Sequence, residues 1–195
     1  MGYRIGFDIG STTIKAVVLD ENNQICYKSY ERHKAQVRQK ALDKLVELKK
    51  YTKEPFKFAI SGSGALGLCE QGELPFVQEV FASATGVTKL YPGTDCAIEL
   101  GGEDAKILFF QGSVEQRMNS TCAGGTGAFI DQMSTLLNMS LEEMNEASLN
   151  YHRLYPIASR CGVFAKTDIQ PLINQGVDKC DLCASIFQAV VDQTI

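Results

Sequence analysis

Hydrophobic and polar positions fall into two similar blocks along this chain of 195 residues, and each block opens with three predicted strands. In the first block, short apolar runs indicate strands, whereas residues 35–51 carry apolar side chains at helical spacing with Lys and Arg between them. The predicted elements of this block are strands at 3–10, 14–20, 24–30, 56–60 and 75–80, and helices at 35–51 and 82–90.

The pattern restarts after Pro92-Gly93, which we interpret as the boundary between a first lobe, residues 1–93, and a second lobe, residues 94–195. In the second lobe we expect strands at 95–100, 106–110 and 114–118, and helices at 126–137, 141–147, 168–174 and 181–195. Three strands, a helix, a strand and a helix are the order of a ribonuclease H-like half-domain. The predicted fold class is therefore α/β with two similar lobes, and the second is expected to be incomplete because its last helix has no stop signal.

Two glycine-containing segments, Asp8-Ile-Gly-Ser-Thr-Thr-Ile-Lys15 and Glu99-Leu-Gly-Gly-Glu-Asp-Ala-Lys106, carry the first candidate chemistry. Each places an acid, a tight glycine turn and polar residues after an apolar run. Glycine lets the backbone approach a ligand closely, and successive amides can then face an anion. An acid at the end of a strand can hold a metal ion that bridges phosphates.

This pair of segments resembles the phosphate 1 and phosphate 2 loops of the actin, sugar kinase and chaperone ATPase superfamily, which implies binding of ATP or ADP with Mg²⁺. The residues expected to face the phosphates are Gly10, Ser11, Thr12, Thr13, Lys15, Gly101, Gly102 and Glu103. The expected catalytic acids are Asp8, Glu99 and Asp104. Superfamily members usually carry Asp where this chain has Glu99, so a metal there is expected to be held through water. The strand–helix section that encloses the adenosine in the superfamily is not found in this sequence.

Composition narrows the classes of function. A net charge of −4 gives no support for a nucleic-acid partner. No apolar run approaches the roughly 18 residues that span a membrane, and the amino end enters a strand directly instead of forming a signal peptide. Seven scattered cysteines, an odd number, indicate reduced thiols or metal ligands instead of a disulfide framework. We therefore expect a cytoplasmic protein with no membrane partner.

Two cysteines, Cys122 and Cys161, each stand just before a glycine-containing turn and a predicted helix. Amides at a helix start stabilise negative charge, so each thiol is expected to lose its proton readily and to bind metal. Two cysteines are too few for a four-iron cluster, but a two-fold dimer would supply four.

Four motifs in order resemble the activators of 2-hydroxyacyl-CoA dehydratases and the ATPase subunits of benzoyl-CoA reductase. They are Asp-Ile-Gly-Ser-Thr, Leu-Gly-Gly-x-Asp-x-Lys, Cys-Ala-Gly-Gly-Thr-Gly followed by Phe129, and Cys-x-Val-Phe-Ala. The resemblance implies a homodimer with one [4Fe-4S] cluster shared by the subunits, held by Cys122 and Cys161 of each. It implies ATP-driven transfer of one electron from a donor such as ferredoxin or flavodoxin to a partner acyl-CoA dehydratase. Departures at Ala128, Lys166 and Ser83 indicate a divergent branch, in which the dehydratase component could be fused to the same chain.

Other motifs leave alternatives open. A kinase for sugars or acetate would share both phosphate loops without needing the two cysteines, and a module that binds nucleotide without turnover would need neither catalysis nor metal. Gly62-Ser-Gly-Ala-Leu-Gly67, with Glu79 further on, would suit a dinucleotide-binding oxidoreductase, or else a glycine-rich connection at the rim of a sheet. Cys180-Asp-Leu-Cys183 is interpreted as two small apolar residues on one helix face, and His33 and His152 are expected to be solvated.

Overall fold

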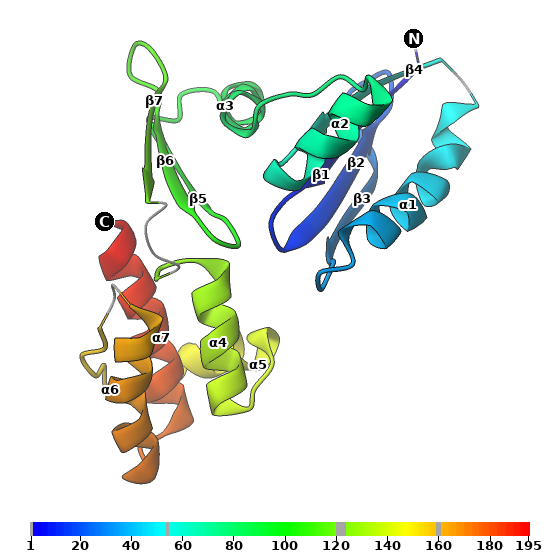
Figure 1. The fold of residues 1–195 in the computed structure, drawn as a ribbon. Coiled ribbons are helices and arrows are strands. Elements are labelled where there is room, and N and C mark those ends of the chain that lie inside the picture. Colours follow the sequence, from blue (N-terminus) through cyan, green and yellow to red (C-terminus); the bar gives the residue numbers. More distant parts are fainter. Residues whose placement is uncertain (1, 54, 120–123, 159–160) are drawn as a thin grey trace. The chain divides into compact units, whose positions relative to one another are not determined.

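The computed structural model describes residues 2–53, 55–119, 124–158 and 161–195, and it divides into two compact units (Figure 1). Unit 1 comprises Met1–Asp95 and Phe110–Val114, and unit 2 comprises Cys96–Phe109 and Glu115–Ile195. Each unit has its own hydrophobic core. Among the helices in the described part of the chain, none combines the length and apolar character needed to cross a membrane.

Unit 1 is built on a four-stranded sheet in the order β3–β2–β1–β4. The strands are β1 (Tyr3–Ile9), β2 (Thr13–Leu19), β3 (Ile25–Arg32) and β4 (Phe56–Ser61). The first three form an antiparallel meander, and β4 then pairs in parallel with β1. Meander and parallel return strand match the predicted ribonuclease H-like order.

The α-helices described in unit 1 are α1 (Val37–Leu48), α2 (Leu66–Gly72) and α3 (Glu79–Leu90). Alternation along β1 turns Ile5, Phe7 and Ile9 to one face, where they are almost fully buried against residues of α1 and α2. The ends of β1, β2 and β4 are thereby fixed by a packed core, and the loop after β1 starts from a rigid base.

The strand expected at 75–80 is wrong. Only one parallel bridge forms there, between Ile60 and Phe76, because α3 already begins at Glu79. The α2 helix was not expected, since its glycines disfavour helix formation. The helix expected at 35–51 is α1 followed by a 3₁₀ turn at Lys49–Thr52.

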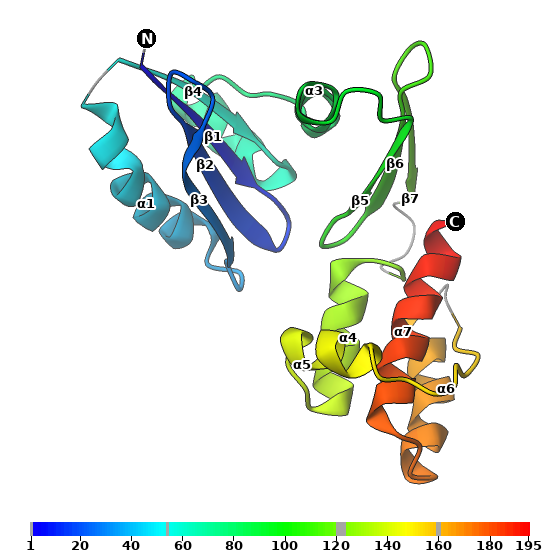
Figure 2. The same ribbon diagram turned by 180° about the vertical axis from the view of Figure 1, so that it is seen from behind.

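Unit 2 joins a small sheet to four helices (Figure 2). The antiparallel strands, in the order β5–β6–β7, are β5 (Cys96–Leu100), β6 (Ala105–Phe109) and β7 (Glu115–Asn119). The helices are α4 (Gly127–Leu137), α5 (Leu141–Ser148), α6 (Gly162–Asn174) and α7 (Lys179–Thr194). Apolar residues from the helices make the core of this unit, with Phe129 and Met133 of α4 among the most buried.

Caps set several helix limits in unit 2. Ser140 and Glu143 form a capping box at the start of α5, and Asp178 caps α7 by accepting from the Cys180 amide. The α6 helix begins at Gly162, six residues before the predicted start at 168, so Cys161 is its N-cap residue.

Candidate nucleotide loops and cysteine ligands

The first loop is a tight hairpin between β1 and β2. Asp8 lies directly opposite Lys15 in the antiparallel register, and the Lys15 Nζ is 2.7 Å from Asp8 Oδ2. The Gly10 amide donates to the Thr13 carbonyl at 2.9 Å, which closes the turn around exposed Ser11 and half-buried Thr12. The predicted phosphate-facing residues of this loop therefore gather at one hairpin tip, although the Thr13 side chain is buried.

The second loop, between β5 and β6, repeats this geometry. Glu99 lies opposite Lys106, and the Gly101 amide donates to the Asp104 carbonyl at 2.8 Å. The buried Lys106 has its Nζ 3.1 Å from Asp104 Oδ2 and 3.9 Å from Glu99 Oε1. Both loops thus hold an acid and a lysine seven residues apart, in the same register and around the same turn bond. In the second loop Asp104 makes the closer ion pair with Lys106.

The α4 helix supports the second loop from within unit 2. The amides of Gly127 and Ala128, in the first turn of α4, donate to the carbonyls of Gly101 and Gly102, each at 2.9 Å. A Cβ on Gly127 would lie 3.2 Å from the Gly101 oxygen, so glycine permits this close approach. Because these two amides are already paired with carbonyls, they are not available to stabilise a thiolate, which weakens the expectation that the start of α4 activates Cys122. Cys122 itself lies outside the described residues.

Cys161 is the second predicted cluster ligand, and it is partly exposed at the N-cap of α6. Its side chain makes no capping hydrogen bond, and its carbonyl accepts from the Ala165 amide at 2.9 Å. Cys161 therefore stands at the N-terminal end of a 13-residue helix. Next to it, Val163 and Phe164 are 71% and 66% exposed.

Comparison with known proteins decides the family. A model of the "BadF/BadG/BcrA/BcrD ATPase family" matches residues 5–195. This chain belongs to that family. The match covers nearly all of the chain and both loops, and it confirms the resemblance drawn from the four motifs.

Two curated relatives of this BadF/BadG/BcrA/BcrD-type ATPase are dehydratase activators. The (R)-2-hydroxyglutaryl-CoA dehydratase activating ATPase of Acidaminococcus fermentans is 26% identical, over 99% of this chain and 76% of that protein. The activator of lactoyl-CoA dehydratase of Anaerotignum propionicum is 29% identical, over 98% and 75%.

Two solved structures share the fold. The activator of the 2-hydroxyisocaproyl-CoA dehydratase from Clostridium difficile, with bound ADPNP, matches with a TM-score of 0.87 and 28% identity. The match covers 98% of this chain and 73% of that one. Component A of the A. fermentans (R)-2-hydroxyglutaryl-CoA dehydratase also gives a TM-score of 0.87, with 26% identity and coverage of 100% and 76%. These matches confirm the predicted actin-type ATPase fold class.

The glycine motif at 62–67 packs against the first loop of this family member. Gly62 adopts a φ of +100°, and a Cβ there would lie 2.2 Å from the Ile9 oxygen and 2.5 Å from Asp8 Oδ1. Glu79 accepts a 2.8 Å hydrogen bond from the Ser63 amide. The motif is therefore a close-packed connection at the sheet rim, and the dinucleotide-binding alternative gains no support.

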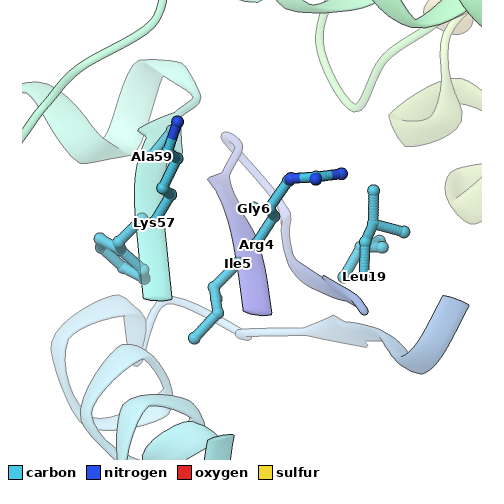
Figure 3. A pocket seen from close by; sticks show the side chains of 8 residues that line it. Arg4, Ile5, Gly6, Leu19, Lys57 and Ala59 are labelled. Carbon is cyan, nitrogen blue, oxygen red and sulfur yellow. The ribbon is translucent and has the colours of Figure 1, made fainter. Parts of the chain in front are cut away.

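Hollows on the unit 1 sheet do not coincide with the full set of predicted site residues. One of about 500 Å³ is lined by Arg4, Gly6, Leu19 and Lys57, away from the loop end of β1 (Figure 3). Another of about 340 Å³ has Asp8 and Lys15 among its lining residues. The candidate site residues are therefore located by the hairpin tips and their ion pairs, and not by a hollow in the surface.

The two thiols of the Cys180–Cys183 motif both have raised pKa values. Burial raises the pKa of the Cys183 thiol to about 11, and the hydrogen bond with Asp178 raises the pKa of Cys180. Both thiols thus favour the protonated form, as expected for apolar helix residues and unlike metal ligands. Within the described residues, no three His, Cys, Asp or Glu side chains gather as a metal site. The expectation of a solvated His33 is wrong, because this side chain is only 5% exposed beside the first loop.

Proposed function

We propose that this chain is the ATPase part of an activator that hydrolyses ATP to pass one electron at low potential to a 2-hydroxyacyl-CoA dehydratase component. The observation that carries the proposal is the pair of hairpins with matching acid–lysine register, in a member of a family whose named relatives activate such dehydratases. Homologous activators act with a dehydratase component, which supports the same kind of partner here.

In this proposal the two loops bind the phosphates of ATP. The Gly10 and Gly101 amides close the turns, so the amides of Ser11 and Thr12 in the first loop and of Gly102 and Glu103 in the second face phosphate oxygens. Lys15 offers positive charge. Mg²⁺ suits the chemistry of each loop by itself, because Asp8 in the first and Glu99 and Asp104 in the second present partly exposed carboxylates beside the turns, and hard cations prefer such oxygens. When bound, it would neutralise phosphate charge. A water molecule oriented by an acid of the second loop attacks the terminal phosphate, and ADP and phosphate leave.

The proposed redox group is one [4Fe-4S] cluster held by Cys122 and Cys161 from each of two copies. The Cys161 end of this set fits, since its thiol is partly exposed at a helix start and lacks a capping partner. Exposed Val163 and Phe164 supply apolar surface for a second copy next to it. The cluster would accept one electron from a ferredoxin or flavodoxin and yield it to the dehydratase. Free thiols suit a cytoplasmic location.

The decisive experiment compares cysteine pairs. We expect Cys122→Ser or Cys161→Ser to abolish iron binding and cluster-dependent dimerisation after anaerobic reconstitution. The matched control is the double variant Cys180→Ser with Cys183→Ser, which should keep both because these thiols favour the protonated form. Iron analysis and sizing report the result. Iron lost from the control but kept by Cys122→Ser would refute the ligand assignment.

Colour and substrate separate this proposal from a kinase. A reconstituted activator is brown and hydrolyses ATP without a phosphoryl acceptor, whereas a kinase of the superfamily is colourless and needs one. A colourless protein that phosphorylates a sugar or acetate would overturn the proposed function.

A further inference from the structure

We infer that His33 is a positioning residue that orients the first phosphate loop for nucleotide binding; the inference rests on the proposed ATPase function. His33 follows β3 directly, and its ring lies against the hairpin between β1 and β2. It is one of only two histidines in the chain and is 5% exposed, so it is a buried titratable group that the proposed mechanism does not otherwise use.

His33 contacts the loop twice. Its Nε2 is 3.3 Å from the Gly10 carbonyl oxygen, and its backbone amide donates to the Thr12 carbonyl at 3.1 Å. A carbonyl oxygen can only accept, so Nε2 carries the proton.

The other ring nitrogen, Nδ1, is buried and has no hydrogen-bond partner among the described residues. Buried polar atoms are normally paired, so an unpaired one marks a side chain retained for another reason. Here Nδ1 stays without a hydrogen-bond partner while Nε2 contacts the Gly10 carbonyl. A hydrophobic side chain of similar size would fill the same space at no such cost, which indicates that the donor at Nε2 is the useful part.

The orientation of Gly10 explains that use. In a trans peptide unit the C=O and N–H point in opposite directions. Because the Gly10 carbonyl faces the buried ring, the Ser11 amide of the same peptide unit points away from it, and Ser11 is exposed. The two carbonyls bound by His33 are likewise turned from the exposed tip, where their partial negative charge would repel phosphate oxygens. His33 thus leaves amides, not carbonyls, at the surface that a phosphate approaches.

The chain keeps His33 in place through an unfavourable backbone turn. Lys34 and Ala35 both adopt positive φ, at 47° and 62°, which costs energy for residues other than glycine. This turn lets the Gln36 amide donate to the His33 carbonyl at 2.8 Å just before α1 begins. Strain of this kind persists where the surrounding structure fixes it, and here it fixes the residue that holds the loop.

The test compares His33→Leu, which removes the ring donor, with His33→Gln, which keeps an N–H donor at similar reach. The backbone contact to Thr12 is unchanged in both, and His152→Leu serves as the histidine control. We expect the Leu variant to bind Mg-ADP about tenfold more weakly, equivalent to about 1.4 kcal/mol, while Gln restores binding to within about twofold of wild type. The KM for ATP should rise with kcat nearly unchanged, because the loop binds ground state and transition state alike.

Mg-pyrophosphate is the matched ligand, since it has phosphates without adenosine. A phosphate-orienting role predicts that His33→Leu weakens pyrophosphate binding by the same factor as Mg-ADP binding, and that His33→Gln restores both. Equal Mg-ADP affinity in wild type and the Leu variant would overturn the inference alone, as would failure of Gln to restore binding. Failure of the wild type to bind any nucleotide would instead refute the proposed function. If the Leu variant does not fold, ¹⁵N NMR of the wild-type ring decides, because a proton on Nδ1 instead of Nε2 contradicts the contact.

Discussion

Substitution of Gly62 by Ala gives the most quantitative test of how β4 packs on the first loop. A Cβ at this position would lie 2.2 Å from the Ile9 carbonyl oxygen, and Ile9 belongs to the backbone of a central strand that cannot rotate away. The φ and ψ of Gly62, +100° and 145°, are also strained for any residue other than glycine, by about 1–3 kcal/mol. Overpacking adds about 1–3 kcal/mol. The variant should therefore lose about 2–6 kcal/mol, a large part of the roughly 5–15 kcal/mol that stabilises a typical protein.

The same motif supplies two internal controls. Gly67 lies in α2, and a Cβ there meets no atom within 4 Å, so Gly67→Ala should stabilise the helix by about 0.5–1 kcal/mol. Gly64 is intermediate, with a Cβ 3.0 Å from Ile9 Cγ2 and 3.1 Å from the Ile9 oxygen. Gly64→Ala should cost about 1–3 kcal/mol.

Urea unfolding monitored by tyrosine fluorescence suits this series, because five of the seven tyrosines belong to unit 1. The urea concentration at the unfolding midpoint should increase in the order Gly62→Ala, Gly64→Ala, wild type, Gly67→Ala. In a dinucleotide fingerprint the third glycine is needed for close helix–strand packing. Equal losses for Gly62→Ala and Gly67→Ala would therefore refute the packing described here and revive that alternative.

Three further predictions concern other parts of the chain. Ala35→Gly should raise the free energy of unfolding by about 0.5–1 kcal/mol, because Ala35 has a φ of 62°; a lower urea midpoint would contradict this. Asp181 accepts from the His152 and Arg153 amides, which lowers its pKa, so its stabilising effect is present above the unfolded pKa of about 4 and is lost as pH falls through the lower folded value. Asp181→Asn should reduce the acid dependence of the melting temperature between pH 7 and 3, and an unchanged pH profile would argue against that role. Asp8→Asn should lower ATP turnover roughly a hundredfold, far more than Thr13→Ala, because in the proposed mechanism the Asp8 carboxylate would position the metal on the phosphates; equal losses would argue against that metal role.

The sequence predicted the sheets better than the helix starts. Alternation in β1 and the two acid–glycine–lysine segments were sufficient to predict the meanders, whereas the ion pair between Asp8 and Lys15 became visible only in the structure. The start of α6 was missed because Val163 and Phe164 are exposed in its first turn. Their spacing therefore does not form the periodic apolar face by which a helix is predicted. The strand expected at 75–80 failed because Glu79, whose side chain binds the Ser63 amide, already belongs to a helix.

His33 shows what local patterns do not contain. Its neighbours in the sequence are Arg32 and Lys34, which favour an exposed side chain, whereas its ring partner is the carbonyl of Gly10, 23 residues away. Every residue has a backbone carbonyl, so the residue type does not reveal which carbonyl is the partner. The pairing could therefore be found only after β1, β2 and β3 had been aligned in one sheet.

The shared register of the two loops has a consequence for metal dependence. The first loop carries one carboxylate, Asp8, against one ammonium, Lys15, and so is neutral. The second carries Glu99, Glu103 and Asp104 against Lys106 alone, and so is an anion before any ligand arrives. A bare phosphate would meet repulsion at the second loop, whereas a phosphate carrying a divalent cation would not. The two hairpins have the same turn and register but different charge, so a divalent cation would matter more at the second loop than at the first.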